Sequence, residues 1–281
     1  MAGGRVTAAM RATAFFAAAM ILGGAAAASV PGLPAVAPEG PALANAGHGV
    51  QVRVQSSGDA DADAVLAAVA DIDKGGLLSV KDHEDALRSA LANMPKPFVR
   101  EQRIGDEIRY RGDSLDDCLR YAVSSAPRRG SRSFVCLGNP YPAAAFYLGS
   151  YYNEVGQPDR ALEVLDLGRL AGPDSPVVAS ERDAALMALH RWDDALAGAN
   201  QALAVADLAS GDRARLLRNR GYALTELKRL DEAEQAYRDS LALEPDNALA
   251  HNELDYIAKL KAGGPTAPPG VLFRPNAPKG K

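Results

Sequence analysis

The sequence has few of the residues that most often carry out chemistry. Its 281 residues include two cysteines, four scattered histidines and one tryptophan. The H-E-x-x-H, G-x-S-x-G, P-loop and G-x-G-x-x-G motifs, which identify zinc peptidases, hydrolases and nucleotide-binding folds, are all absent from it. The sequence therefore predicts no catalytic centre, no metal centre and no cofactor.

An excess of positive charge is also missing. The formal net charge is -4, whereas nucleic-acid-binding domains usually carry a clear surplus of lysine and arginine. We therefore expect no nucleic-acid partner. Because 47% of the residues are hydrophobic, the chain can build one or two globular domains with a real core.

The N-terminus has the pattern of an export signal. Arg5 and Arg11 provide a positive start, residues 12–28 form an apolar run without a charge, and Ala28 ends a small-residue cleavage site. The run is short for a membrane span, which needs about 20 residues. The pattern predicts a cleaved signal over 1–28, a bacterial periplasmic location and no membrane span afterwards. An uncleaved N-terminal anchor is the alternative.

Export gives the cysteine pair a structural meaning. Cys118 and Cys136 are the only cysteines, and they lack the close spacing of a redox or metal-binding pair. In an oxidising compartment such a pair is most simply a disulfide, and closing a loop of this length stabilises a fold by about 3 kcal/mol. We predict a Cys118–Cys136 disulfide.

The first half of the chain predicts a small α+β unit over 49–140, after a proline- and alanine-rich linker over 29–48. Alternating residues from Val50 to Val54 are typical of a half-buried strand. A helical region over 62–92 is broken at Gly75-Gly76, and residues 98–112 form two alternating segments that meet at Gly105-Asp106, as in a hairpin. The remaining expected elements are a helix from 113 or 114 to 125, a strand over 133–137, and a flexible basic tail over 263–281.

The second half is built from an internal repeat. Residues 142–175 align with 214–247, and a weaker copy occupies 176–213. Gly149 aligns with Gly221, Ala161 with Ala233 and Pro173 with Pro245. The middle copy keeps Ala195 but has Asp183 in place of the glycine, Ala199 in place of a large residue and Asp207 in place of the proline.

A period of 34 residues with small side chains at these places resembles the tetratricopeptide repeat. The resemblance implies a mainly α fold, in which three helix pairs stack and a polar helix over 248–262 caps them. Glycine and alanine would lie where the two helices of a pair cross. It further implies a groove, lined by the first helix of each pair, that receives a peptide or a partner helix.

The residues expected in this groove combine aromatic, amide and cationic side chains. Arg215, Arg218 and Tyr222 follow one another at spacings of three and four, so they share one helix face. Two guanidinium groups beside a tyrosine suit a carboxylate or an acidic peptide. A solvated face is the alternative, because arginine is plentiful in this helix. The predicted partner-binding residues are Phe146, Asn153, Met187, Arg215, Arg218, Tyr222, Asn252 and Tyr256.

One known binding mode of the family is not expected. The clamp that holds chaperone C-termini needs lysine and asparagine in the first copy, and Phe146 and Ser150 occupy those places. We therefore predict a non-enzymatic scaffold of the cell envelope whose partner is a protein or peptide, an acidic peptide being one candidate.

Two other function classes compete with this one. Residues 71–82 resemble an EF-hand calcium loop, with acids at the first, third and last places, but Gly75 and Asp82 depart from the pattern. A helical hairpin turned at Gly75-Gly76 is the structural alternative. An enzyme in the α+β part would need its acids gathered in a cleft. The candidate acids are Asp106, Asp113, Asp116 and Asp117.

Overall fold

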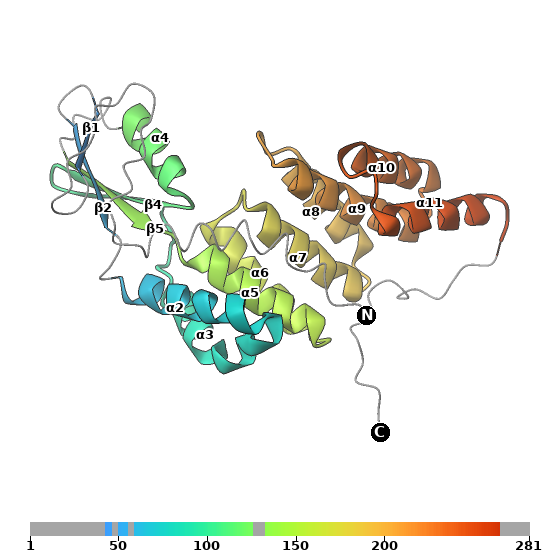
Figure 1. Ribbon diagram of the computed structural model, residues 1–281, viewed down its shortest axis with the longest axis horizontal. Coiled ribbons are helices and arrows are strands. Elements are labelled where there is room, and N and C mark those ends of the chain that lie inside the picture. Colours follow the sequence, from blue (N-terminus) through green and yellow to red (C-terminus); the bar gives the residue numbers. More distant parts are fainter. Residues whose placement is uncertain (1–42, 47–49, 56–58, 126–132, 265–281) are drawn as a thin grey trace. The chain divides into compact units, whose positions relative to one another are not determined.

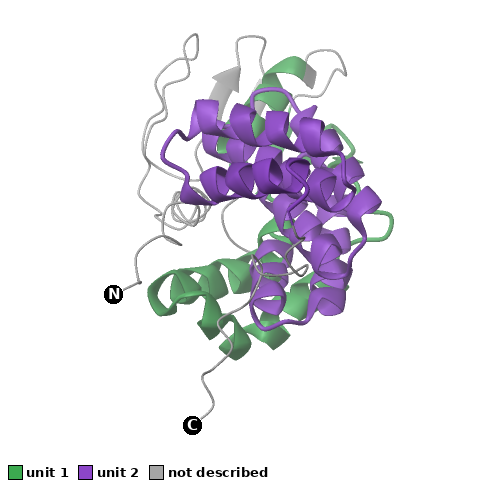
Figure 2. Ribbon diagram, turned by 90° about the vertical axis from the view of Figure 1, so that its right-hand side faces the viewer, with its two compact units in different colours: residues 1–144 green, residues 145–281 purple. Residues whose placement is uncertain are grey.

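The structure is a computed structural model that describes residues 43–46, 50–55, 59–125 and 133–264. The chain divides into two compact units, residues 1–144 and 145–281 (Figure 2). The expected signal segment lies outside the described residues, as does nearly all of the basic tail. Each unit is described by itself.

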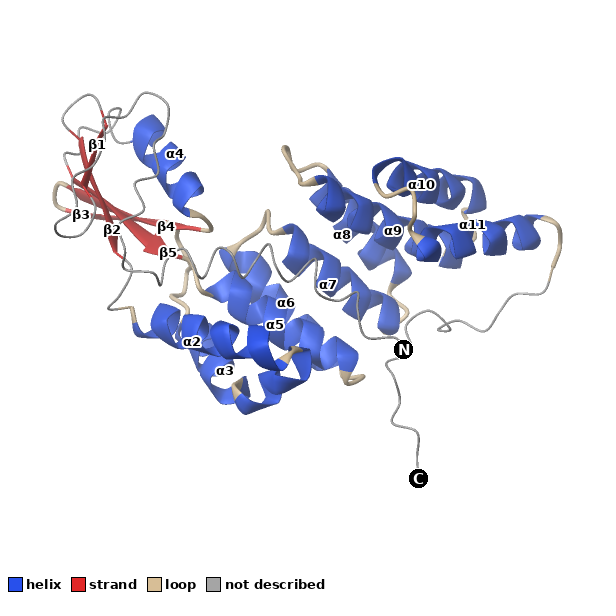
Figure 3. Cartoon of the chain, viewed as in Figure 1, coloured by secondary structure: helices blue, strands red, loops and turns tan. Residues whose placement is uncertain are grey.

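Unit 1 contains a mixed five-stranded sheet in the order β1-β2-β5-β4-β3 (Figure 3). Its strands are β1 (Leu43–Ala46), β2 (Val50–Gln55), β3 (Glu101–Ile104), β4 (Glu107–Gly112) and β5 (Ser133–Gly138). β5 runs parallel to both β2 and β4, and the outer pairs β1–β2 and β3–β4 are antiparallel. β1 falls inside the segment expected to be a linker. A strand can pair through its backbone alone, so it needs no alternating side chains.

The hairpin prediction is confirmed. Ile104 pairs with Glu107, which leaves Gly105 and Asp106 as a two-residue turn. The φ of Gly105 is +60°, a value that only glycine adopts without strain at this place.

One helix packs on the sheet of unit 1 and is linked to it by a disulfide. Helix α4 (Leu115–Ser125) connects the parallel strands β4 and β5. The Ser114 hydroxyl accepts from the Asp117 backbone N–H at 2.7 Å, and the Asp117 carboxylate accepts from the Asp113 N–H at 3.1 Å, which caps the helix start. Cys118 of α4 is disulfide-bonded to Cys136 of β5, as predicted. The small core around this bond is Val52, Ile108, Tyr110, Cys118, Ala122, Phe134 and Cys136.

A helical hairpin completes unit 1. It consists of α2 (Ala60–Gly75), the short 3₁₀ helix η1 (Leu77–Asp82) and α3 (Glu84–Asn93). Asp59 caps α2 by accepting from the Ala62 N–H at 3.2 Å, and Gly76, with a φ of +80°, ends the helix. The predicted break at Gly75-Gly76 is therefore a turn between packed helices.

Unit 2 is helical throughout its described part, as expected from the repeat (Figure 1). Its helices are α5 (Tyr141–Glu154), whose first four residues belong to unit 1, α6 (Pro158–Ala171), α7 (Pro176–Ala188), α8 (Trp192–Leu203), α9 (Ser210–Glu226), α10 (Leu230–Leu243) and α11 (Ala248–Lys261). The predicted stack of helix pairs with a following helix is confirmed. Among the described helices, none is both long enough and apolar enough to cross a bilayer.

The crossing points of the helix pairs explain the spacing of small residues. A Cβ added to Gly149 would lie 2.5 Å from Leu165 Cγ, and one added to Gly221 would lie 2.8 Å from Tyr237 Cε2. Either distance is too short for a non-bonded contact, so a larger side chain would push the helices apart.

In the middle pair, the small residue that allows close packing lies on the second helix. Asp183 of α7 occupies the place of the glycine, and Gly198 of α8 lies opposite it, where a Cβ would be 2.3 Å from Asp183 Oδ1. The sequence alignment identified the departure at Asp183 but not the compensating glycine. The small residue has moved from the first helix to the second.

Candidate functional site

The first helices of successive repeats are joined directly by side-chain hydrogen bonds. Asn153 of α5 donates to the Glu181 backbone carbonyl at 3.0 Å and to its carboxylate at 3.2 Å. Asn219 of α9 donates to the Ser180 carbonyl at 3.2 Å and to its hydroxyl at 3.1 Å. We call the surface of α5, α7 and α9 around these residues the first-helix face. Side chains from three repeats therefore meet on this face.

Glu181 lies at the centre of the first-helix face and was not among the predicted residues. Burial raises the pKa of its carboxyl, while the Asn153 hydrogen bond, the Arg215 guanidinium and the Ser150 hydroxyl lower it. Glu154 of α5 raises it further as a second negative charge. The spacing of the predicted residues gave no signal for Glu181, because its partner Asn153 lies 28 residues away on another helix.

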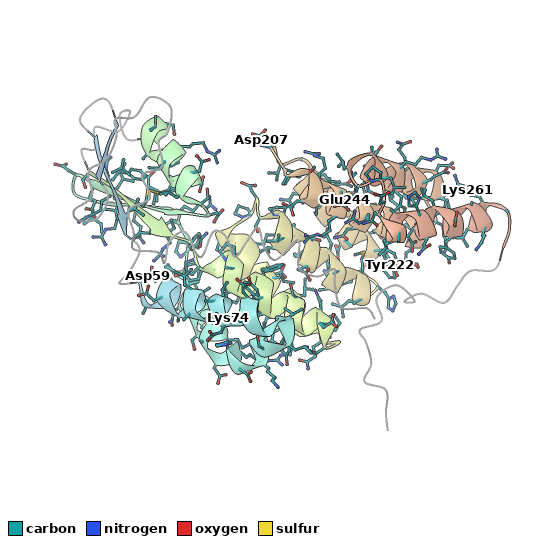
Figure 4. The ribbon with its side chains drawn as sticks, in the orientation of Figure 1. Asp59, Lys74, Asp207, Tyr222, Glu244 and Lys261 are labelled. Carbon is teal, nitrogen blue, oxygen red and sulfur yellow. A yellow bond between two sulfur atoms is a disulfide. The ribbon has the colours of Figure 1, made fainter. Side chains whose placement is uncertain are left out.

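The two predicted arginines lie on α9, but acids of the same stack already face them. Arg218 donates to Glu244 at the end of α10, at 2.6 Å (Figure 4 labels Glu244), and Asn247 donates to the same carboxylate oxygen at 3.1 Å. Arg215 lies 3.9 Å from Asp212. An acidic ligand would therefore meet partly neutralised guanidinium groups.

The expected apolar anchors are mostly covered. Phe146, Met187 and Tyr222 are only 4%, 2% and 8% exposed. The Tyr222 ring contacts the Trp192 ring edge-on, with centroids 6.0 Å apart (Figure 4 labels Tyr222). These side chains fill the space between helices. Their contact with a partner stays a prediction.

The cap helix α11 presents the last two predicted residues. Asn252 is exposed and Tyr256 is half-buried. Lys261, at the end of α11, pairs with Asp231 and Glu234 of α10, at 2.5 Å from each. The cap is thus tied to the preceding helix.

The acids proposed for an enzyme are only partly gathered. Asp113 and Asp117 share Arg100, which forms an ion pair with Asp113 and lies 3.6 Å from Asp117. Asp106 is in the hairpin turn, and Asp116 pairs with Arg120 on the exposed side of α4. Asp113 and Asp117 form ion pairs with Arg100, and Asp117 also caps the start of α4. Their geometry therefore gives no support to a catalytic role.

The calcium alternative receives no support either. Residues 71–82 form the end of α2, a turn at Gly76 and the helix η1, and not an open loop. Within the described ranges, no group of three histidine, cysteine, aspartate or glutamate side chains is placed to hold a metal ion.

Comparison with known proteins identifies the repeat. The family model of the tetratricopeptide repeat matches residues 214–247. RNA polymerase II-associated protein 3 of Mus musculus is 33% identical over 123 residues, which are 44% of this chain and 18% of that protein. The Homo sapiens protein of the same name is 32% identical over 114 residues, or 41% of this chain and 16% of that protein. The chain thus spans less than a fifth of the length of these relatives.

Two solved structures are similar in sequence to part of this chain. The first TPR domain of human RPAP3 is 29% identical, with a TM-score of 0.42, over 45% of this chain and 96% of that domain. The first TPR of Spaghetti (RPAP3), bound to the HSP90 peptide SRMEEVD, is also 29% identical, with a TM-score of 0.41, over 45% of this chain and 97% of that one. The chain contains tetratricopeptide repeat sequence.

Proposed function

We propose that this protein is a non-enzymatic interaction scaffold that binds a peptide segment of a partner protein along the first-helix face. The observation that carries the proposal is the direct joining of α5, α7 and α9 through Asn153–Glu181 and Ser180–Asn219. These bonds hold the face in one conformation before a ligand arrives. A preformed surface loses little conformational entropy on binding, so more of the contact energy appears as affinity.

Selection of peptides tests the proposal without knowledge of the natural partner. A phage-displayed library of random peptides is selected on the purified protein, and the bound region is mapped by backbone amide hydrogen exchange. We expect protection in α5, α7 and α9. Protection confined to unit 1, or to the second helices α6, α8 and α10, would contradict the proposal.

A matched pair of substitutions sharpens this test. Ala184 is partly accessible and lies four residues after Ser180, on the same side of α7, whereas Ala197 is exposed on α8. Ala184→Arg should block the selected peptides by bulk, while Ala197→Arg should leave their affinity unchanged. Equal effects of the two variants would show that the peptides bind elsewhere.

We also propose that the scaffold works in the cell envelope after export. The Cys118–Cys136 disulfide supports this location, because such bonds persist mainly in oxidising compartments. Fusing residues 1–60 to a reporter enzyme that is active only outside the bacterial cytoplasm tests the proposal. A reporter that stays inactive while the fusion is stably expressed would refute it.

A further inference from the structure

The first-helix face has an unusual concentration of hydrogen-bond acceptors around Glu181. Asn153 uses its amide nitrogen to bind Glu181, and its buried Oδ1 atom has no hydrogen-bond partner among the described residues. Ser150, which is 8% exposed, faces the Glu181 carboxyl from α5, so the carboxylate lies between the Ser150 hydroxyl and the Asn153 amide. A buried polar atom without a partner is costly, so the Asn153 Oδ1 atom can gain from a donor.

The charged groups around Glu181 also favour a positively charged ligand. Glu154 and Glu181 bring two carboxylates, and Arg215 brings one guanidinium group. Asp212, 3.9 Å from Arg215, is a third acid. Burial disfavours the ionised form of Glu181, and a bound cation would favour it; with Glu181 ionised, three acids stand against one base. Arg218 does not alter this balance, because it is engaged by Glu244 at 2.6 Å.

We propose that the Glu181 cluster, formed by Ser150, Asn153 and Glu181, recognises a basic side chain of the bound peptide. Ammonium and guanidinium groups carry several N–H donors and no acceptor, so they complement a carboxylate flanked by an amide oxygen and a hydroxyl. The inference rests on the proposed function and specifies the chemistry of its ligand: the segment bound by the first-helix face carries an arginine or lysine opposite α7.

Three small probes test the charge preference directly. N-acetyl-arginine amide carries one positive charge, N-acetyl-glutamine amide is neutral and N-acetyl-glutamate amide carries one negative charge. Each is titrated into the ¹⁵N-labelled full chain while the NMR signals of the Asn153 side-chain amide and of the Ser150 and Glu181 backbone amides are followed. We expect saturable shifts with the arginine probe alone. Saturation with the glutamate probe, or with none of the three, would overturn the inference.

Substitutions then assign the effect to the cluster. Glu181→Gln keeps the shape and removes the charge, and it should weaken binding of the arginine probe by about fivefold or more, because a charge-assisted hydrogen bond is lost. Glu232→Gln, on the exposed surface of α10, should leave binding unchanged. Unchanged binding to Glu181→Gln would overturn the assignment.

Substitution of Arg215 distinguishes a basic from an acidic ligand, because it should change their affinities in opposite directions. Arg215→Gln removes the cation that competes for Glu181, so binding of the arginine probe should tighten. An acidic ligand held by Arg215 would lose affinity instead. Should Glu181→Gln fold poorly, intermolecular NOE contacts between the probe and residues 150, 153 and 181 of the unmodified protein decide the question, and their absence would overturn the inference.

Failure of this inference is distinguishable from failure of the proposed function. Library peptides that protect α5, α7 and α9 without an excess of arginine or lysine would remove the Glu181 cluster as a cation site and leave the scaffold intact. Library peptides that bind away from the first-helix face would remove the proposed function, whatever the small probes do.

Discussion

Asp183 makes the stability of the repeat stack depend on pH. Its side chain lies at the crossing of α7 and α8, against Gly198, and is 1% exposed. Burial raises the pKa of this carboxyl from 3.8 to about 8. In the folded chain the group is therefore mostly protonated near neutral pH, whereas in the unfolded chain it is ionised.

The sign and size of the effect follow from this difference. Because the folded pKa is the higher one, the stabilising contribution is complete below 3.8 and is lost as the pH rises towards about 8. Within this window the free energy of unfolding falls by at most about 1.4 kcal/mol per pH unit. Between about pH 5 and about pH 8 the loss from Asp183 is on the order of 3 to 4 kcal/mol.

Asp183→Asn removes the ionisation and keeps the shape, so the variant should gain stability over the wild type as the pH rises. Urea unfolding at several pH values measures the gain, with the fluorescence of Trp192, the chain's only tryptophan, as the signal. Contributions from other groups cancel in the difference between the two proteins. Asp193→Asn, at an exposed position on α8, is the control: its free energy of unfolding should differ from that of the wild type by the same amount at every pH. Parallel pH profiles for wild type and Asp183→Asn would refute the reasoning.

Three further predictions concern packing, the disulfide and the cap. Gly149→Ala should lower the free energy of unfolding by about 1 to 3 kcal/mol, because its Cβ would overlap Leu165, and urea unfolding followed by circular dichroism measures the loss; an unchanged midpoint would mean that α5 and α6 do not pack closely. Replacing both Cys118 and Cys136 by serine should cost unit 1 about 3 kcal/mol and leave unit 2 unchanged, which amide hydrogen exchange of each unit can resolve; equal losses in both would contradict this. Burial raises the pKa of Glu253 from 4.5 to about 7, so its contribution is lost as the pH rises between these values. Glu253→Gln should therefore flatten the pH dependence of the melting temperature in this range, and an unaltered slope would count against a buried cap.

The features predicted correctly from the sequence depend on residues close together in the chain, or on the number and spacing of the cysteines. The turn at Gly105 follows from two alternating segments that meet at a glycine. The disulfide was predicted from two cysteines that lack metal-binding spacing, together with the expectation of export. Strand β1 was missed because an edge strand is defined by the backbone of its neighbour, which leaves no mark on its own side chains.

The candidate site was predicted less well than the fold. The sequence placed Arg215 and Arg218 on one face of a helix, which local periodicity is enough to show. It did not show that Glu244 faces Arg218, because 26 residues separate them. Glu181 was missed for a related reason, since its bond to Asn153 joins residues 28 apart on two different helices.

The sequence by itself determined that small residues at matching places of each repeat would pack helices in pairs, because helix periodicity and side-chain size act over short distances. Only the tertiary structure decided that Gly198 compensates for Asp183 and that acids partly neutralise Arg215 and Arg218. Those outcomes depend on which faces of separate helices meet, and that is set by the packing of the whole stack.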